Sequence, residues 1–445
     1  MLKQERAKGL DQSGQSIEST FKRGKSLKDE PTVKKEDGRH CICMEEVKAA
    51  YKKVRSNNGA GGIDNMTWWE FDKQKEGLLY KLWNRMTSGS YFPEATKEVI
   101  IAKANGGERR LGIPVLLDRI AQQVVVDVLE PIVEKEFHAD SYGYRPAKSA
   151  HDAVAQCRQR CFEHEWAIDL DIKGFFDNID HELLMKAVER FTQEKWILMY
   201  VKRWLTAPTH QAEGKMEQRT KGTPQGGVIS PLLANIFLHF VFDKWMVKYH
   251  SNNPFERYAD DVIVHCKSLS EAKQLLEEIK KRMQQCKLEL HGEKTKIVKC
   301  QRWGNEDEHP YKSFDFLGYR FKPRKASTKS GKIIGVFTPG ISNKAVKKIQ
   351  GWMRENRVFK RTNETLAEIG KKIEKQTRGW INYYSKFRKS DLQKVFNPVN
   401  RQIAKWYSKK HKRGITEATR RVQELSKTHS YLFAHWYAGY TFFQN

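Results

Sequence analysis

Alternating apolar and acidic residues mark the clearest strand of the chain, at 166–172, and place Asp169 and Asp171 on one face of it. A second pattern, around 257–264, predicts a strand, a tight turn and another strand. Helical periodicity precedes this pattern at 230–250 and follows it at 270–285. Strands separated by helices predict an α+β sheet layer in the middle of the chain.

Helix and strand patterns also occupy the first third of the chain. Helical spacing at 45–58 ends at a glycine-rich cluster, a strand follows at 97–102, then a Gly-rich hairpin at 103–110 and a long amphipathic helix at 117–137. Residues 1–44 lack apolar periodicity and have the composition of a basic mobile arm. Beyond about residue 330 the strand patterns fade, and we expect basic helices that carry Trp and Tyr.

The composition indicates a folded protein whose partner is a polyanion. The chain has 445 residues, of which 39% are hydrophobic, and its net charge is +27. Residues 341–445 hold 24 Lys or Arg against 7 Asp or Glu, so +17 of this charge lies in under a quarter of the chain. Aromatic residues interleave with these cations and could stack on unpaired bases. A helical bundle with aromatic core residues and solvated lysines is the simpler alternative, and it stays open here.

The seven cysteines are scattered and contain no C-x-x-C pair, so neither a disulfide framework nor a zinc module is expected. We expect Cys157 and Cys161, together with His151 and His181, to be packing or solvent residues. The longest apolar stretch, 228–242, is interrupted by polar residues, and the N-terminus has no apolar signal region. The expectation is a cytoplasmic protein, in the cytosol or nucleoid of a bacterium, with no membrane partner.

Three aspartates form the main candidate for chemistry. Asp171 ends the first strand, and Asp260 and Asp261 occupy the turn of the second pattern. Carboxylates crowded together repel one another unless a divalent cation screens them, and hard oxygen ligands suit Mg²⁺. Two such ions serve nucleic-acid polymerases by activating a 3′-hydroxyl and stabilising pyrophosphate. Either acidic segment alone is more often a turn or a solvated face.

Several motifs in a fixed order resemble the reverse transcriptases encoded by group II introns, with their maturase function. The similarity covers about residues 45–445 and looks like the compact class that lacks an endonuclease domain, because the His/Asn and Cys-pair elements of that domain are not found before residue 445. The motifs are RLGIP (110–114), DRI (118–120), SYGYRPAKSAHD (141–152), DIKGFFD (171–177), TPQGG (223–227), YADD (258–261), GEKTK (292–296), FLGY (316–319) and RGWINYY (378–384).

The resemblance implies roles for the residues that match. Asp171 and Asp260 would be the main ligands of two Mg²⁺ ions, with Asp261 in support. Phe176 would act as a steric gate against a ribose 2′-hydroxyl. The remaining substrate contacts would come from Lys103, Arg110, Gln225 and Lys294, and simple surface charge is the alternative for both lysines. The candidates for RNA contact are Arg378, Trp380, Tyr383, Tyr384, Lys409 and Lys410.

The predicted architecture is an α+β right-hand polymerase. The expected divisions are an arm at 1–44, fingers at 45–165, a palm at 166–325, a thumb or maturase region at 326–400 and a basic C-terminal segment at 401–445. The implied function is RNA-directed DNA synthesis from deoxynucleoside triphosphates on a primer and template. The same protein would bind its intron RNA in a ribonucleoprotein, assist splicing, and copy the intron into target DNA by target-primed reverse transcription during retrohoming. Two alternatives are a splicing maturase without polymerase activity and a reverse transcriptase domesticated for repair or CRISPR-linked defence.

Overall fold

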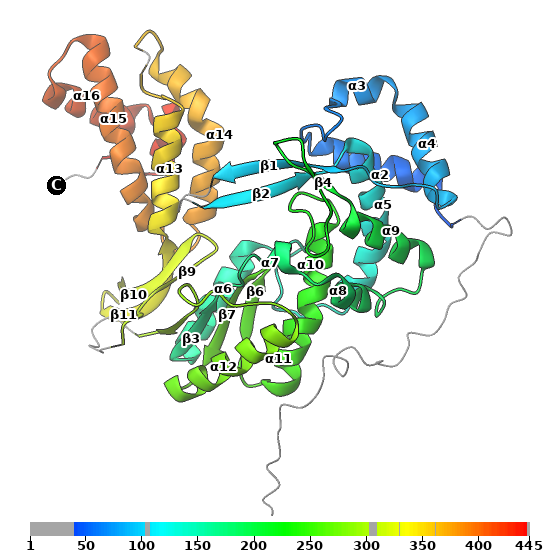
Figure 1. Cartoon of the computed structure of the whole chain (residues 1–445). Coiled ribbons are helices and arrows are strands. Elements are labelled where there is room, and N and C mark those ends of the chain that lie inside the picture. Colours follow the sequence, from blue (N-terminus) through cyan, green and yellow to red (C-terminus); the bar gives the residue numbers. More distant parts are fainter. Residues whose placement is uncertain (1–39, 103–106, 302–308, 329, 361, 443–445) are drawn as a thin grey trace, which may run out of the picture.

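The computed structural model describes residues 40–102, 107–301, 309–328, 330–360 and 362–442. Figure 1 shows three groups of elements: a helical group with a long hairpin, a sheet with flanking helices below it, and a separate bundle that ends the chain. They follow the order of the expected fingers, palm and thumb. Residues 1–39 of the expected arm lie outside the described residues.

The palm sheet has four antiparallel strands in the order β6-β7-β3-β8. They are β6 (Phe255–Tyr258), β7 (Asp261–Cys266), β3 (Trp166–Leu170) and β8 (Lys296–Lys299). Side chains alternate between the two faces: Ile168 and Val264 join the core with α12 (Leu269–Gln285), whereas Ala167, Ile263 and Val298 join the core with α6 (Ala150–Glu163). Because both faces are covered, this sheet is the rigid base of the molecule.

The fingers combine helices with a sheet whose strands come from distant parts of the chain. The helices are α2 (Met44–Ser56), α3 (Trp68–Lys73), α4 (Lys75–Thr87) and α5 (Leu116–Glu134). β1 (Thr96–Ala102) pairs antiparallel with β2 (Glu108–Ile113) and parallel with β4 (Thr209–His210), which pairs with β5 (Met216–Glu217). Two strands that lie within the expected palm segment therefore complete the fingers sheet.

A run of helices connects the two sheets. It comprises α7 (Phe175–Asn178), α8 (His181–Val188), α9 (Lys195–Thr206), α10 (Ser230–Leu238), the π-helix η1 (His239–Asp243) and α11 (Lys244–Tyr249). The helix expected at 230–250 is thus interrupted by a π-helical segment, a departure that often occurs at functional sites.

The last third begins with a sheet, and its strand β11 lies beyond residue 330, where strand patterns were expected to fade. β9 (Phe314–Phe316), β10 (Tyr319–Ser327) and β11 (Ile333–Ile341) pair in the order β11-β10-β9. β11 contains Gly335, Pro339 and Gly340, which indicate a turn in sequence. An edge strand tolerates them, because one side of its backbone is unpaired.

The helical bundle follows this sheet and has its own core. Its elements are α13 (Asn343–Glu355), α14 (Leu366–Tyr384), η2 (Lys389–Leu392), α15 (Gln393–His411), α16 (Ile415–Thr428), η3 (Ser430–Leu432) and α17 (Ala434–Tyr437). Ser342 and Thr365 cap α13 and α14 by accepting hydrogen bonds from backbone amides of the first turn. Across the described residues, no helix has both the length and the apolar character needed to cross a membrane.

Candidate active site

Strand pairing brings the three aspartates to one end of the palm sheet. Leu170 of β3 lies opposite Val262 of β7, so Asp171, the next residue, continues the ladder toward Asp261, the first residue of β7. Asp260 precedes Asp261 in the turn that joins β6 to β7, where Tyr258 pairs with Asp261. Neighbouring strands lie about 4.8 Å apart. Residues separated by ninety positions in the sequence thus share one edge.

The electrostatics of this edge are those of crowded carboxylates. Burial raises the pKa of Asp261 to about 6, helped by Asp260 and Asp171. Burial also raises the pKa of Asp260, an effect that Asp171 increases and Arg109 partly offsets. Asp169 lies two residues before Asp171 on the same face of β3. Burial, followed by the charges of Asp261 and Asp171, raises its pKa to about 7. A divalent cation would relieve this repulsion, and carboxylate oxygens are the donors that Mg²⁺ prefers.

The aspartates are neighbours without being in ligand contact. Within the described chain, Asp171, Asp260 and Asp261 do not bring three ligand oxygens all within 4.8 Å of one another. Asp171 is 38% exposed, and Asp261 is also exposed although the surrounding protein removes part of the water around its carboxylate, so both side chains have room to turn. A shared cation would have to draw these oxygens together.

Buried neighbours fix the turn that carries Asp260. Ala259 adopts a left-handed φ of 56°, and a Cβ on Gly143 would lie 2.5 Å from the Ala259 nitrogen. Glycine is therefore required at 143 for the segment to approach the turn so closely. Arg257 is fully buried and donates to the Ala259 carbonyl over 3.2 Å.

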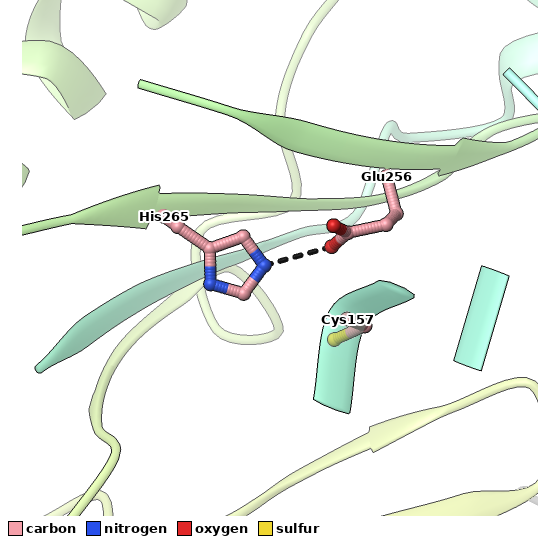
Figure 2. Close-up of side chains that lie close together, drawn as sticks. All are labelled: Cys157, Glu256 and His265. Carbon is pink, nitrogen blue, oxygen red and sulfur yellow. Dashed lines mark hydrogen bonds and ion pairs between the residues drawn. The ribbon is translucent and has the colours of Figure 1, made fainter. Parts of the chain in front are cut away.

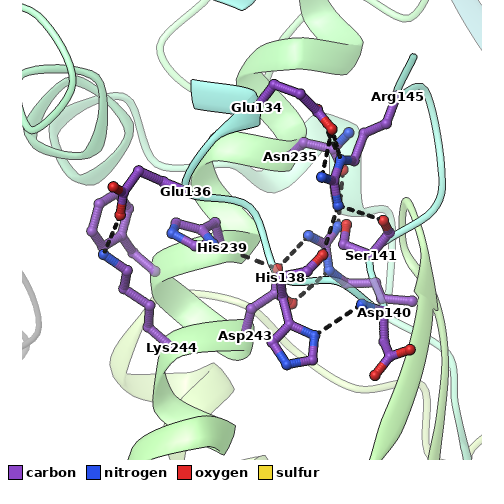
Figure 3. A network of polar contacts seen from close by, with 12 residues as sticks. Glu134, Glu136, His138, Asp140, Ser141, Arg145, Asn235, His239, Asp243 and Lys244 are labelled. Atoms are coloured by element: carbon purple, nitrogen blue, oxygen red, sulfur yellow. Dashed lines mark hydrogen bonds and ion pairs between the residues drawn. The ribbon is translucent and has the colours of Figure 1, made fainter. Parts of the chain in front are cut away.

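The charge of Arg257 is balanced by Asp243, which the π-helix η1 presents. Two hydrogen bonds of 2.6 and 2.7 Å join them, and Arg257 also donates to Asn235 Oδ1 over 2.9 Å. Asn235 in turn donates to the Gly143 carbonyl over 2.7 Å. Although burial opposes ionisation, Arg257 and His239 hold the pKa of Asp243 at about 2. Figure 3 shows Asn235, His239 and Asp243 reaching from this helical run toward the segment 138–145.

The loop after α12 brings a cation to Asp171. Lys294 Nζ lies 3.6 Å from Asp171 Oδ1, and the Asp171 amide donates to Thr295 Oγ1 over 3.3 Å. The Lys294 side chain is half exposed, so it has the freedom to follow a ligand. The structure thus places Lys294 beside the aspartates.

Phe176 sits on α7, close to the Gly- and Pro-rich loop. Its carbonyl accepts a hydrogen bond from the Thr223 amide over 2.8 Å. Gly222, with φ of 78°, passes so close that a Cβ there would lie 2.8 Å from the carbonyl oxygens of Phe176 and Asp177. Phe175 is buried beneath, and its ring meets that of Phe176 edge-on at 5.4 Å. The backbone of Phe176 is therefore fixed by the loop, and its half-buried ring rests against Phe175.

Gln225 and Arg110 line one cavity of about 230 Å³ between the fingers sheet and α7. The Gln225 side chain donates to the Asp177 carboxylate over 3.3 Å. The backbone carbonyl of Gln225 accepts a hydrogen bond from the Gly112 amide over 2.9 Å. Arg110 lies 3.7 Å from Glu98. Lys103, the other expected triphosphate contact, lies outside the described residues.

Sequence reasoning missed three residues whose charge or ring lies near the aspartates. Arg109, rather than Arg110, is the β2 arginine that acts on Asp260 and Asp261. Successive strand residues point to opposite faces of a sheet. The sequence could therefore have predicted that only one of Arg109 and Arg110 faces the aspartates. Burial, and then the charge of Asp260, raises the pKa of Tyr144. Lys344 of α13 lowers the pKa of Asp261.

The aromatic residues expected to contact RNA lie in packed positions. The hydroxyl of Tyr383 donates to the Leu317 carbonyl over 2.8 Å, and its ring stacks on His151 at 4.9 Å. A Cβ on Gly318, in the turn between β9 and β10, would lie 3.0 Å from the Tyr384 hydroxyl. Trp380 meets Trp352 edge-on at 5.3 Å inside the bundle. These rings join the bundle to the sheet layer, and contact with RNA stays a prediction for them.

The expected basic contacts are more accessible. Arg378 is 57% exposed and pairs with Glu374 over 2.8 Å. Lys409 is exposed at the end of α15, whereas Lys410 donates to the Glu364 carbonyl and lies over the Trp406 ring. Of these three, Arg378 and Lys409 present the most free surface.

Together, the fingers, the palm sheet with its aspartate edge and the following helical bundle define a nucleic-acid polymerase of the right-hand class. Residues 101–321 match the family model described as reverse transcriptase, an RNA-dependent DNA polymerase, and residues 342–425 match the maturase-specific domain of group II introns. The chain belongs to the family of group II intron reverse transcriptases and maturases. Enzymes with this domain are nucleotidyltransferases that generally use divalent metals.

The chain is similar to several known proteins. Protein YkfC of Escherichia coli is 33% identical over 298 residues, which cover 58% of this chain and 75% of that protein. The group II intron-encoded protein LtrA of Lactococcus lactis is 32% identical over 252 residues, which cover 56% of this chain and 40% of LtrA. Among solved structures, telomerase from Candida albicans with a fragment of telomeric RNA aligns over 84% of this chain and 68% of that chain, at 13% identity and a TM-score of 0.43.

Proposed function

We propose that this protein copies RNA into DNA at the aspartate edge of the palm, using two Mg²⁺ ions, and that its natural template is the group II intron RNA that encodes it. The observation that carries the proposal is the convergence of Asp171, Asp260 and Asp261 on one end of the sheet. A polyanion binder has no physical need to gather carboxylates where a phosphate chain would lie.

In this proposal Asp171 and Asp260 hold the ions, and Asp261 supports them. The bound ions supply charge neutralisation for the attacking 3′-hydroxyl and for the leaving pyrophosphate. Lys294, whose Nζ lies 3.6 Å from Asp171 Oδ1, would protonate the leaving group or neutralise it. Arg109 and Arg110 extend from the fingers hairpin, and with Lys103 they would bind the triphosphate.

The sugar and template contacts would come from α7 and from the Gly- and Pro-rich loop at 221–231 that packs against it. Phe176 would fill the volume that a ribose 2′-hydroxyl needs, so deoxynucleotides are preferred. Gln225 lies beside Asp177 and would contact the nucleotide and the template strand. The Gly- and Pro-rich loop permits the close backbone approach that such a contact needs.

The helical bundle would bind the intron RNA. Its match to the maturase-specific domain and its excess of Lys and Arg support this role. The protein would stabilise the folded intron for splicing, and after reverse splicing it would copy the intron from a primer in the target DNA. We place this activity in the cytoplasm, where intron RNA and chromosomal DNA are both accessible.

The aspartates test the polymerase assignment. Asp260→Asn with Asp261→Asn should abolish extension of oligo(dT) on poly(rA), because the carboxylates that would hold Mg²⁺ are gone, while RNA affinity stays unchanged. Glu163→Gln with Glu277→Gln removes two exposed carboxylates elsewhere and should leave extension intact. Persistent extension by the first variant would reject the site and favour the splicing maturase without polymerase activity.

A further inference from the structure

Tyr144 belongs to the SYGYRPAKSAHD motif at 141–152, to which the proposed chemistry assigns no role. Tyr144 is 55% exposed, and its ring centroid lies 6.3 Å from that of Tyr258, two residues before Asp260. Its hydroxyl makes no hydrogen bond with any residue that the structure describes. The ring and the hydroxyl are therefore available to a substrate at the aspartate turn.

The backbone holds Tyr144 in a conformation that disfavours its side chain. Its φ is 56°, in the left-handed region, where glycine fits with less strain. Residues kept in such conformations cluster at active sites and ligand clamps, where the surrounding structure enforces them. The strain indicates that the side chain at this position has a function that glycine could not serve.

Contacts on both sides of Tyr144 enforce this conformation. A Cβ on Gly143 would lie 2.5 Å from the Ala259 nitrogen, so the chain before Tyr144 is packed against the turn. The Arg145 side chain is only 5% exposed and pairs with Glu134 over 2.6 Å (Figure 3). It also donates to two backbone carbonyls upstream in the chain, at 2.6 Å each. Tyr144 is therefore presented by a rigid frame.

The strand beside this frame is fixed as well. Ser141 forms a parallel β-bridge with Arg257, so the segment lies at the β6 edge of the palm sheet. Glu256, the preceding residue of β6, is fully buried, and its Oε2 lies 2.7 Å from Nε2 of the equally buried His265 (Figure 2). Arg257 is itself buried and paired. These buried ion pairs keep the position of Tyr144 constant relative to the aspartates.

The sheet order places Tyr144 and Phe176 on opposite sides of the aspartates. β7 lies between β6 and β3. Phe176 follows β3 beyond Asp171, whereas Tyr144 follows the segment that pairs with β6. In an in-line phosphoryl transfer, the attacking oxygen and the leaving oxygen lie on opposite sides of the reacting phosphate. Because Phe176 contacts the incoming nucleotide in the proposed function, Tyr144 faces the primer terminus that supplies the 3′-hydroxyl.

The chemistry of the hydroxyl indicates which edge of the primer terminus it contacts. Burial and the charge of Asp260 raise the pKa of Tyr144, so its hydroxyl stays protonated at neutral pH and can donate. A polymerase that copies any template needs contacts that do not depend on sequence. The minor groove offers such contacts, because it presents the acceptors purine N3 and pyrimidine O2, whereas the major groove differs for every base pair.

We propose that Tyr144 is a positioning residue for DNA synthesis, whose hydroxyl donates a hydrogen bond to the minor-groove acceptor of the terminal base pair of the primer and template. This inference rests on the proposed function of the aspartate edge and adds a contact that holds the 3′-hydroxyl there. A mismatched pair displaces the acceptor, so the same contact favours extension of correctly paired termini.

A primer analogue tests the hydrogen bond directly. The full chain extends primers that end in deoxyadenosine or in 3-deazadeoxyadenosine, opposite uracil of one RNA template. The analogue pairs normally but has no N3 acceptor. For the wild type it should lower kcat/KM by about 3- to 10-fold, the size of one neutral hydrogen bond. Tyr144→Phe should lower kcat/KM on the ordinary primer by a similar factor and show no further loss on the analogue.

Tyr80→Phe is the matched control, because Tyr80 is 57% exposed but lies on α4 of the fingers. It should behave as the wild type does with both primers. Equal extension of the two primers by the wild type would overturn the contact, as would a Tyr144→Phe variant that stays as sensitive to the analogue as the wild type. Either result leaves the polymerase assignment intact, whereas a wild type that extends neither primer would reject that assignment and this inference together.

Discussion

At the scale of single residues, two buried aspartates of this protein have pKa values shifted in opposite directions, because their partners differ. Asp243 faces the guanidinium of Arg257, and its pKa is held at about 2. Asp118 is equally buried, but it accepts hydrogen bonds from neutral groups, the Tyr91 hydroxyl at 2.5 Å and the Glu94 amide at 3.0 Å. Burial therefore prevails, and the pKa of Asp118 rises to about 7. The partner decides the charge state at neutral pH.

Asp118 should make stability fall as pH rises. Its pKa is about 7 in the folded chain and near 3.8 in the unfolded chain, so its contribution is complete below about pH 4 and is lost as pH rises through 7. Asp118→Asn, which stays neutral, should reduce the loss between pH 5 and pH 8 by roughly 2 to 4 kcal/mol. Urea unfolding at pH 5 and pH 8 measures this loss of unfolding free energy, and Asp127→Asn on the same helix is the control. Equal slopes in both variants would contradict the prediction.

At the scale of elements, buried contacts beneath the turn fix the conformation of the β6–β7 hairpin. Arg257 anchors the turn to η1, and the Gly143 segment packs against its backbone. Such a buried ion pair is costly to form but more costly to break, because removal of one partner leaves an unpaired buried charge. The hairpin thereby keeps one conformation at the point where the carboxylates must be placed.

Arg257→Met should destabilise the palm by about 3 to 5 kcal/mol, because Asp243 is left buried and unpaired. Adding Asp243→Asn should restore a substantial part of that loss, since the orphaned charge is removed. Denaturant unfolding of the single and double variants gives the coupling. Arg158→Met on exposed α6 surface should stay within about 0.5 kcal/mol of wild type. A double variant no more stable than Arg257→Met would exclude the charge as the cause.

The same scale shows what sequence can predict. The strands at 166–172 and 257–264, the helix after them and the convergence of Asp171 with Asp260 follow from period and motif order. β11 was missed because Gly335 and Pro339 resemble turn residues, although an edge strand accepts them. The approach of Cys157, Glu256 and His265 was missed because these residues come from separate elements, which only the tertiary fold brings together.

At the scale of the whole molecule, charge and chemistry occupy different regions. The palm edge gathers carboxylates, whereas the chain from 341 onward carries +17 of the total +27. Lys344 belongs to the basic region and also acts on Asp261, so the two regions face each other at the start of α13. A bound nucleic acid would thus be held by one region and processed by the other.

Salt dependence should locate the RNA interface. Replacing Lys375, Lys389 and Lys409 by Gln should flatten the plot of log affinity against log salt by roughly 0.7 to 0.9 for each lost phosphate contact. All three side chains are exposed in the helical bundle. The control replaces three exposed lysines on or near α12, which are Lys267, Lys273 and Lys281. An equal slope in both triple variants would place the interface elsewhere.

The shared fingers sheet has a consequence for synthesis on the ribosome. β1 and β2 emerge early, but their neighbours β4 and β5 are translated about a hundred residues later. Until His210 leaves the exit tunnel, the part of the β1 edge that β4 covers stays open to pairing with other chains. The first half of the nascent polypeptide is therefore exposed to premature association, and a pause in translation before that point would lengthen this vulnerable period.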